Sequence, residues 1–482
     1  MKYRSRNFTL ILLLLFLLCS NTLFAKKAVS PYDYGLREAH TNIDRYWVLY
    51  KTHLEAIKQG VDVDYKGVNR LDIEIPKDAK PIPISGSCNF RGMTLNVLNT
   101  VKDMFLFEMD QRTTKIKVDK WMIDSGNFNS IPEFKKGLYL LIVEDETPWI
   151  ENRKGHSYGH IRKDCLLLYN GKALNHPISP YNNEQSKPRC EYTPIVSGIK
   201  TISDLMVIRD SSSTCKTLVL KIARQNNITI KRINVQTPQN DSLFADRVFQ
   251  IESSSNVRLI DCYVNGTYSQ KKKYGYGFNI NNVYNLSFKN VKANAKWGVF
   301  CSSNVNNVYF EKCSLNRVDT HCYGRDVKCV DCYFFDRECS MTSFFGSIYY
   351  LRCYFDNCIP LHYDGTYGVY TDVLLSMKDC KFKPGDNRCL LISAANLPGD
   401  NNEHRRAELR RNYWPFINIH KLQIITPEDR QRDVYLFWFV NKYNASVISN
   451  DVRQKIKITK LVKNVSTRFH IANVDSLETT RH

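Results

Sequence analysis

The sequence lacks the short motifs that mark most cofactor-dependent enzymes. It has no glycine-rich phosphate loop, no Ser-His-Asp signature, no His-Glu-x-x-His helix and no EF-hand loop. Apolar residues at helical spacing are scarce, and beyond the first 25 residues no run is long and apolar enough to cross a bilayer. We therefore predict no cofactor, little helix and no transmembrane segment.

The first 25 residues have the pattern of a secretory signal peptide. Three basic residues precede an apolar run over positions 10–18, and small residues follow up to Ala25. This run is too short to anchor the chain stably in a membrane. We predict a signal peptide over residues 1–25 and a secreted protein, periplasmic or at the cell surface if the source is a bacterium. Cys19 leaves lipidation open, although the residues before it form a poor lipobox.

The chain has far fewer acidic residues than basic ones. The chain has 48 acidic residues against 68 lysines and arginines, which gives a formal net charge of +20. An exported protein this basic is expected to meet an acidic glycan or an anionic cell surface rather than nucleic acid. The plainer interpretation, that the excess lysine only keeps the protein soluble, stays open.

The stretch from Ile228 to Phe382 repeats one short pattern of alternating apolar residues. Each copy has two apolar residues two positions apart, a polar or mixed pair, and then another small or apolar residue. The copies begin at Ile228, Val257, Leu286, Val308, Val327, Ile348 and Leu375. A repeat of roughly 20 to 30 residues built from strands is typical of a solenoid, in which stacked coils share one core.

Strand repeats rich in Asn, Asp and Gly turn residues point to a right-handed parallel β-helix. The stretch resembles the pectate-lyase-like superfamily, which includes polysaccharide lyases, glycoside hydrolases and phage tailspikes. The resemblance lies in the architecture and the repeat, and it implies an all-β fold. No catalytic signature of one family is matched, so function has to be argued from a site.

One helix is expected, from Asn42 to Gln59. Its apolar residues recur near helical spacing, and Gly60 follows as a stop signal. We predict that residues 26–60 form a helical cap over the open end of the solenoid, because an exposed strand edge would pair with other chains. A separate small N-terminal element is the alternative.

The rest of the chain is predicted to be one β-helix domain over residues 61–470. Alternating segments at 115–119 and 137–143 are interpreted as early coils. Less regular segments are predicted to be long loops, over 145–195 and 396–412. Residues 471–482 are expected to fray.

Cysteines recur at one place in the repeat. The chain has 16, and the recurring ones are Cys262, Cys313, Cys332, Cys353 and Cys380. This spacing predicts a stacked column of small buried side chains, a role that free cysteine fills well. Cys165, Cys190 and Cys215 lie outside the column and are better disulfide candidates. Cys329 and Cys332 are three apart in a predicted strand and so point to opposite faces, which argues against a shared metal.

Each repeat has a second strand ahead of the first. Its inward pairs align as Phe249/Ile251, Phe278/Ile280, Val299/Cys301 and Thr320/Cys322. The residues between them then face outward, which places Arg317, Asp319 and His321 in a line on one face. On the two coils before, the same places hold Lys296, Gly298 and Phe300, and Gly275, Gly277 and Asn279. The pattern predicts three polar groups facing solvent over a glycine-lined shelf.

These three residues are the candidate catalytic groups. Asp319 beside His321 would raise the pKa of the imidazole and orient it as a general base or acid. Arg317 would hold Asp319 ionised or bind a substrate carboxylate. The alternatives are ligand binding without chemistry and a surface network that only pins a turn. Substrate-binding candidates around them are Lys296, Trp297, Phe300, Tyr276, Arg325, Asp326, His362 and Asp364, and no metal ligand is assigned.

Two functions follow from this pattern. The first is cleavage of an acidic polysaccharide, either by elimination, with His321 as base and nearby cations stabilising the enolate, or by hydrolysis, with Asp319 paired with Asp326 or Asp364. The second is a non-catalytic glycan-binding or adhesion protein that uses the same face. The sequence leaves the glycan, the bond and the oligomeric state undefined.

Overall fold

The computed structural model describes residues 28–99, 101, 104–150, 160–178, 180–182, 184, 186–209, 218–236, 247–265, 276–294, 299–322, 324–341, 344–364, 371–386, 389–395, 416–439 and 455–473. The predicted signal peptide, the predicted loop over 396–412 and most of the predicted frayed end lie outside these residues. None of the helices described there is long and apolar enough to span a membrane.

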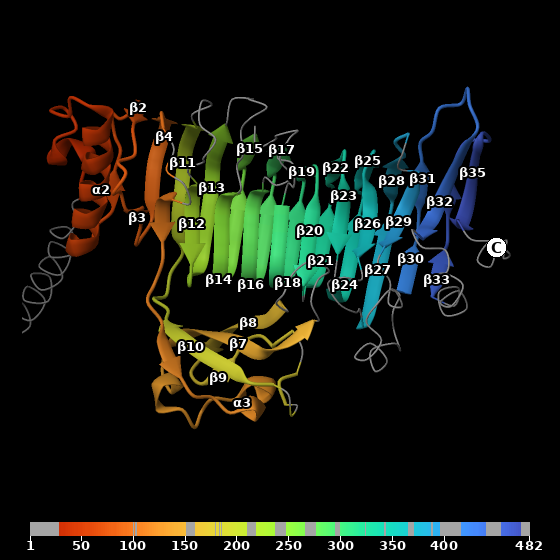
Figure 1. Ribbon diagram of the computed structural model, residues 1–482, viewed down its shortest axis with the longest axis horizontal. Coiled ribbons are helices and arrows are strands. Elements are labelled where there is room, and N and C mark those ends of the chain that lie inside the picture. Colours follow the sequence, from red (N-terminus) through yellow and green to blue (C-terminus); the bar gives the residue numbers. More distant parts are fainter. Residues whose placement is uncertain are drawn as a thin grey trace, which may run out of the picture.

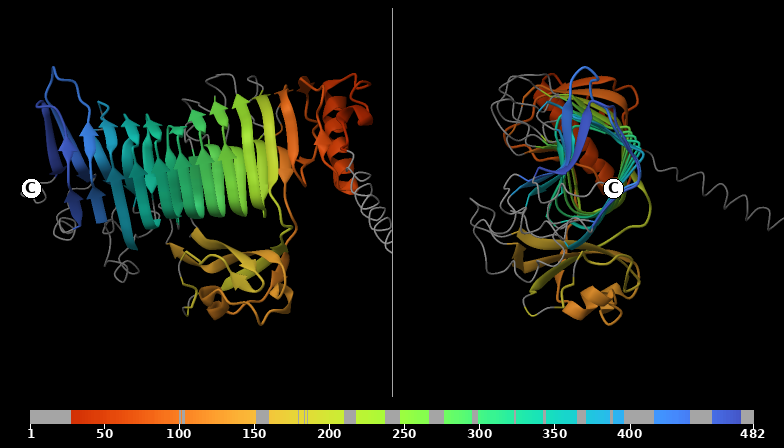
Figure 2. Two further views of the ribbon diagram at one scale, coloured as in Figure 1. Left: turned by 180° about the vertical axis from the view of Figure 1, so that it is seen from behind. Right: turned by 90° about the vertical axis from the view of Figure 1, so that its right-hand side faces the viewer.

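Three parallel sheets wind around one long core, and each complete coil contributes a strand or half of a long strand to each sheet (Figures 1 and 2). The first sheet contains β3 (Ile82–Pro83), β5 (Phe105–Met109), β12 (Leu218–Ala223), the first halves of β14 (Arg247–Ile260), β16 (Tyr276–Lys289) and β18 (Val299–Glu311), then β20 (Val318–Cys322), β23 (Glu338–Met341), β26 (Ile359–Asp364), β29 (Leu390–Ala395), β32 (Arg432–Phe439) and β35 (Thr467–Ala472).

The second sheet contains β1 (Val63–Asp64), the first halves of β4 (Cys88–Val97), β11 (Lys200–Arg209) and β13 (Asn226–Gln236), the second halves of β14, β16 and β18, then β21 (Gly324–Val330), β24 (Phe344–Leu351), β27 (Thr371–Lys378), β30 (Phe416–Ile419) and β33 (Ile456–Ile458). The third contains β2 (Arg70–Ile73), the second halves of β4, β11 and β13, then β15 (Tyr263–Asn265), β17 (Lys292–Asn294), β19 (Ser314–Leu315), β22 (Tyr333–Phe335), β25 (Tyr354–Asp356), β28 (Cys380–Lys383), β31 (Leu422–Ile424) and β34 (Leu461–Val462).

The core is built from like residues stacked coil on coil. Phe249 stacks on Phe278 with ring centroids 5.0 Å apart, and Phe288 stacks on Phe310 at 4.7 Å. The predicted cysteine column is confirmed, because all five of its thiols are free and buried. Each donates a hydrogen bond to the carbonyl two residues earlier, as Cys313 Sγ does to Glu311 O at 3.3 Å.

The corners between sheets use residues that tolerate a left-handed backbone. Between the first and second sheets, Asn256, Asn285 and Asn307 have φ near +55°. Their amides form a chain in which Asn285 Nδ2 donates to Asn256 Oδ1 at 2.5 Å and Asn307 Nδ2 to Asn285 Oδ1 at 3.2 Å. Cys329 and Cys332 are both buried, contrary to the expected opposite faces, because Asp331 at φ 54° turns the chain between them.

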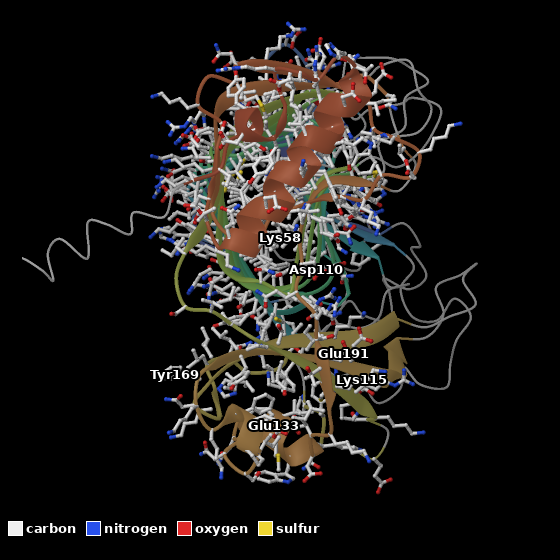
Figure 3. The ribbon with its side chains drawn as sticks, turned by 90° about the vertical axis from the view of Figure 1, so that its left-hand side faces the viewer. Lys58, Asp110, Lys115, Glu133, Tyr169 and Glu191 are labelled. Carbon is white, nitrogen blue, oxygen red and sulfur yellow. The ribbon has the colours of Figure 1, made fainter. Side chains whose placement is uncertain are left out.

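The predicted helix is confirmed. A short 3₁₀ turn, η1 (Pro31–Tyr34), precedes α2 (Asn42–Gln59), and Gly60 ends α2 at φ 63°. Thr41 and Asp44 form a reciprocal capping box, with both hydrogen bonds at 3.0 Å. The helix packs against β1, β2 and β3 and lies across the end of the stack (Figure 3).

Residues 114–194 form a separate inserted domain between β5 and β11. Its antiparallel sheet contains β6 (Thr114–Ile116), β7 (Leu138–Ile150), β8 (His160–Tyr169), β9 (Lys172–Ala173) and β10 (Pro188–Pro194), and it is accompanied by α3 (Lys120–Ser125) and η2 (Pro132–Phe134). It has its own apolar core and lies against β14, β16 and β18 (Figure 1).

This domain corrects two predictions. Segments 115–119 and 137–143 are not early coils, and the expected loop over 145–195 contains the end of β7 and all of β8, β9 and β10. The period-2 pattern identified strands correctly, but the same alternation suits a parallel coil and an antiparallel hairpin. Cys165 and Cys190 are free thiols in different apolar clusters, so they do not pair as suggested.

Candidate functional site

One row of outward positions crosses the first sheet in direct register, and at two of them, Phe300 and Ser340, only the backbone is described. Its members are Glu108, Lys221, Gln250, Asn279, Phe300, Asp319, Ser340, His362, Ser393 and Trp438. We call it the first-sheet row. Neighbours in it are about 4.8 Å apart, the spacing of adjacent strands. Two sequence-predicted residues of the site, Asp319 and His362, therefore lie in one line with Ser340 between them.

Arg317 and Asp319 form an ion pair at the middle of the row. Arg317 Nη2 lies 2.7 Å from Asp319 Oδ2, and Arg317 Nη1 lies 3.8 Å from Glu338 Oε1. One guanidinium thus stands between two carboxylates that come from neighbouring strands. Glu338 was missed by sequence reasoning, because its place beside Arg317 depends on the pairing of β20 with β23.

The expectation that this group faces open solvent is wrong for two of its members. The side chains of Arg317 and Asp319 are only 7% and 2% exposed, whereas that of Glu338 is 30% exposed. Asp319 still lies on the outward side, since its neighbour Thr320 points into the core. Burial of an outward side chain depends on the residues around it, such as Arg317 here, which alternation along one strand cannot reveal.

The predicted register of β20 is also wrong. Val299 pairs with Val318 and Cys301 with Thr320, not with the residues two positions further on. Asp319 consequently lies beside Phe300 rather than beside Gly298. A shift of two residues keeps every side chain on its face, so the period-2 pattern could not detect it. The earlier pairs, Phe249 with Phe278 and Phe278 with Val299, are confirmed.

Several predicted site residues have only their backbone placed. His321 is in β20, Phe300 in β18 and Asp364 in β26, but their side chains lie outside the described part of the structure, as do Lys296 and Trp297 altogether. The proposed contact between Asp319 and His321 thus stays a prediction.

The remaining binding candidates lie in different surroundings. Tyr276 is half-buried at the start of β16, opposite Arg247. His362 is also half-buried, and its Nδ1 atom is buried without a hydrogen-bond partner among the described residues. A nitrogen in that state next to the ion-pair region is available to a bound water or ligand.

Arg325 and Asp326 lie at the corner between the first and second sheets, away from the row. Asp326 has φ 53°, and its Oδ1 accepts from the backbone N and Oγ of Ser347 at 3.0 and 3.1 Å. Its carboxylate therefore holds the turn. Arg325 lies close enough to the inserted domain to lower the pKa of Asp164 there, against burial, which raises that pKa to about 6.

Buried amides line the same side of the coils, and sequence reasoning missed them too. Asn279 is 8% exposed, Asn282 1% and Asn304 2%, and each has a buried side-chain oxygen without a partner among the described residues. Burial of an amide oxygen is costly unless a donor reaches it. The one available signal was the recurrence of Asn four residues before successive copies, at Asn282 before Leu286 and at Asn304 before Val308.

The coils, the three parallel sheets and the shared core define the protein as a right-handed parallel β-helix. No protein-family model matches the chain, and no curated protein matches its sequence. Among solved structures it is similar to the Gp54 tailspike of Acinetobacter baumannii bacteriophage AP22, solved in complex with A. baumannii capsular saccharide, with a TM-score of 0.55 and 12% identity over 94% of this chain and 78% of that one. This likeness is one of fold.

Weaker likenesses involve other β-structures of phages and bacteria. The tailspike gp49 of Pseudomonas phage LKA1 gives a TM-score of 0.47 and 11% identity over 92% of this chain and 81% of that one. PfbA, a surface adhesin of Streptococcus pneumoniae, gives 0.42 and 8% over 93% and 91%.

Proposed function

We propose that this is an exported β-helix protein that binds a polysaccharide chain along the outward face of the first sheet. The observation that carries the proposal is the first-sheet row, whose polar and aromatic groups repeat at a strand spacing close to the length of a sugar unit. Asn279, a member of this row, places an amide on the same face, and amides exchange hydrogen bonds with sugar hydroxyls. The similar AP22 tailspike was solved with a capsular saccharide, which is in keeping with this role.

The glycan in this proposal is acidic and the protein works outside the cell. The formal charge of +20 favours an anionic partner. Export rests on the leader pattern over residues 1–25, with a basic start, an apolar run and a small-residue end. Nucleic acid is the less suitable polyanion for an exported protein.

A second candidate function, cleavage of that polysaccharide, is favoured by the position of Arg317 between Asp319 and Glu338. Glycoside hydrolysis needs two carboxyl groups that act on one bond. A buried Asp319 and a partly exposed Glu338 provide carboxyl groups in different environments, which is how one acts as acid and the other as base. Elimination suits this geometry less well, because Arg317 is already engaged by carboxylates and is less able to stabilise an enolate.

The test uses wild type, Glu338→Gln, Asp319→Asn and His321→Ala with a panel of acidic and neutral polysaccharides. Glu311→Gln, a partly exposed glutamate on the second sheet, is the matched control. Binding is followed by retardation in glycan-containing gels, hydrolysis by new reducing ends, and elimination by the ultraviolet absorbance of unsaturated products.

Hydrolysis predicts that Glu338→Gln lowers the release of reducing ends by roughly 10²- to 10⁴-fold while binding persists. Release that depends on His321 and yields unsaturated ends would identify a lyase instead. Binding without products would leave the protein a glycan-binding β-helix. Failure to bind any glycan, with the fold intact, would overturn the proposal.

A further inference from the structure

Three aromatic side chains lie together on the outward face of the third sheet. Tyr333 and Phe335 belong to β22, and their ring centroids are 5.5 Å apart with an interplanar angle of 22°. Tyr354, directly opposite Tyr333 on β25, has its ring centroid 5.5 Å from that of Tyr333. All three side chains are half-buried, so part of each ring is accessible. We call these three residues the aromatic patch.

The patch has a polar edge. Tyr333 donates its hydroxyl hydrogen to Asp356 Oδ2 at 3.0 Å, and Lys383 Nζ lies 3.1 Å from Asp356 Oδ1. Burial and this carboxylate raise the pKa of Tyr333 to about 12, so the phenol stays protonated and keeps donating. The ring of Tyr333 is therefore fixed in orientation by a bond that an incoming ligand does not need to form.

Exposed lysines stand at both ends of the patch. Lys292, Ser314, Tyr333, Tyr354 and Lys381 follow one another in direct register across five adjacent strands. Lys292 and Lys381 are exposed, and neither forms an ion pair with another described residue. Four strand spacings separate them, about 19 Å in all. The next outward row supplies amides, from Asn265 and Asn294.

The combination fits a saccharide better than an apolar partner. Aromatic faces take the C–H faces of sugar rings, and a patch rimmed by a carboxylate, amides and lysines offers groups for hydroxyls. Lys292 and Lys381 at the ends form no ion pair with a described residue, and the one carboxylate, Asp356, is already engaged by Lys383. The local charge therefore favours a negatively charged ligand. We propose that the aromatic patch is a second glycan site, distinct from the first sheet, that takes a stretch of an acidic polysaccharide.

The second sheet provides a contrast within the same coils. There Lys328 Nζ lies 5.9 Å from the ring centroid of Tyr309 and 5.6 Å from that of Tyr349. These two rings already hold a cation between them, so they are less available to a sugar. Tyr349 is therefore a matched control for Tyr354: an outward, half-buried tyrosine on the neighbouring face of the same coil.

The test compares wild type with Tyr354→Ala, Lys381→Glu and the control Tyr349→Ala. The probes are polygalacturonate and hyaluronan as acidic polymers and dextran as a neutral one, with affinity measured by gel retardation and titration calorimetry. We expect Tyr354→Ala and Lys381→Glu each to weaken binding of an acidic polymer about tenfold, the usual cost of losing a tyrosine anchor. Tyr349→Ala is expected to bind as wild type.

Lys381 is exposed, so its charge reversal tests the site even if Tyr354→Ala destabilises the coil. Wild-type affinity in both patch variants, or an equal loss in Tyr349→Ala, would overturn the second site. Equal binding of dextran and the acidic polymers, unaffected by Lys381→Glu, would overturn the acidic ligand. A dimer of wild type that Tyr354→Ala abolishes would assign the patch to a second copy of the chain.

This result is separable from the function proposed for the first sheet. If only the first sheet binds glycan, Glu338→Gln or Asp319→Asn affects activity or binding and the patch variants do not. If only the patch binds, the pattern is reversed. Additive losses in the combined variant Asp319→Asn with Lys381→Glu would support two independent sites.

Discussion

The coil stack and the inserted domain are both β-structures, but they bury polar groups in different ways. In the stack, corner polar side chains bond to the equivalent residue one coil away, as Asn285 does to Asn256 at 2.5 Å, although the first sheet also holds the nearly buried pair Arg317–Asp319. In the inserted domain, an ion pair is fully buried: Arg162 Nη2 lies 3.3 Å from Asp145 Oδ2, and both side chains are 0% exposed.

This difference predicts how each part responds to damage. Stability in a solenoid is spread over many similar contacts between neighbouring coils, so one lost contact is a small part of the total. The inserted domain has a small core of its own and one buried polar network, made of Asp145, Arg162, Asp164 and Tyr181. One substitution there removes a large share of its stability.

The largest effect is expected from Arg162→Met. Its guanidinium pairs with Asp145, donates to Pro180 O at 2.9 Å and lies 3.5 Å from the ring centroid of Tyr181. Methionine keeps much of the volume but leaves Asp145 as a buried charge without its cation, at a cost of about 3–5 kcal/mol. Pulse proteolysis in urea should show earlier cleavage within residues 114–194, while the coils keep the wild-type midpoint.

The double variant Arg162→Met with Asp145→Leu is the control, because replacing both charges with apolar groups should recover much of the loss. Simultaneous cleavage of coils and inserted domain at one lower urea concentration would contradict the comparison, since it would make the two parts a single cooperative unit.

The next effect is a pH dependence confined to the inserted domain. Burial raises the pKa of the Asp164 carboxyl from 3.8 to about 6, although Tyr181 donates to its Oδ2 at 2.6 Å. Between these values the unfolded chain has lost this proton and the folded chain retains it. The contribution of the Asp164 proton to the free energy of unfolding is therefore fully present below about pH 4. It is lost as the pH rises to about 6, and the total loss is roughly 3 kcal/mol.

Asp164→Asn should remove this slope. The measurement is the urea transition of the inserted domain between pH 4 and pH 7, assigned by mapping of cleavage products, with the variant subtracted from wild type so that other carboxylates cancel. A difference that stays constant with pH would show that Asp164 is ionised in the folded protein throughout.

The same comparison explains what could be predicted from sequence. The repeated pattern, the inward pair Phe278/Ile280 and the helix over 42–59 are local signals, and all are confirmed. Even the cysteine column follows from spacing, because equivalent positions in stacked coils share one environment. Because the coils repeat, residues that pack together across coils occupy equivalent places in a short sequence pattern, so their packing can be predicted from that pattern.

What could not be predicted depends on contacts that the pattern does not encode. β7 and β8 alternate as coil strands do, but their partners are each other. The register of Val318 differs by two residues from the expected one, which alternation cannot distinguish. The burial of Asp319 depends on the side chains around it, and the place of Glu338 beside Arg317 depends on the pairing of the next strand.

The smallest effect is expected at a corner of the stack, from Arg352→Asn. Arg352 binds Asp331 one coil away through two hydrogen bonds, at 2.6 and 2.8 Å, and this contact lowers the pKa of the Asp331 carboxyl. The pair is exposed to solvent and screened by salt, so it adds little. Arg352 has φ 52°, and asparagine adopts that backbone readily, as Asn290 does at φ 52° in the same corner column.

The urea midpoint of the coils should therefore equal that of wild type within error at moderate salt, in contrast to Arg162→Met. A clear drop would mean that the coils, like the inserted domain, depend on individual ion pairs, and the distinction between the two parts would fail.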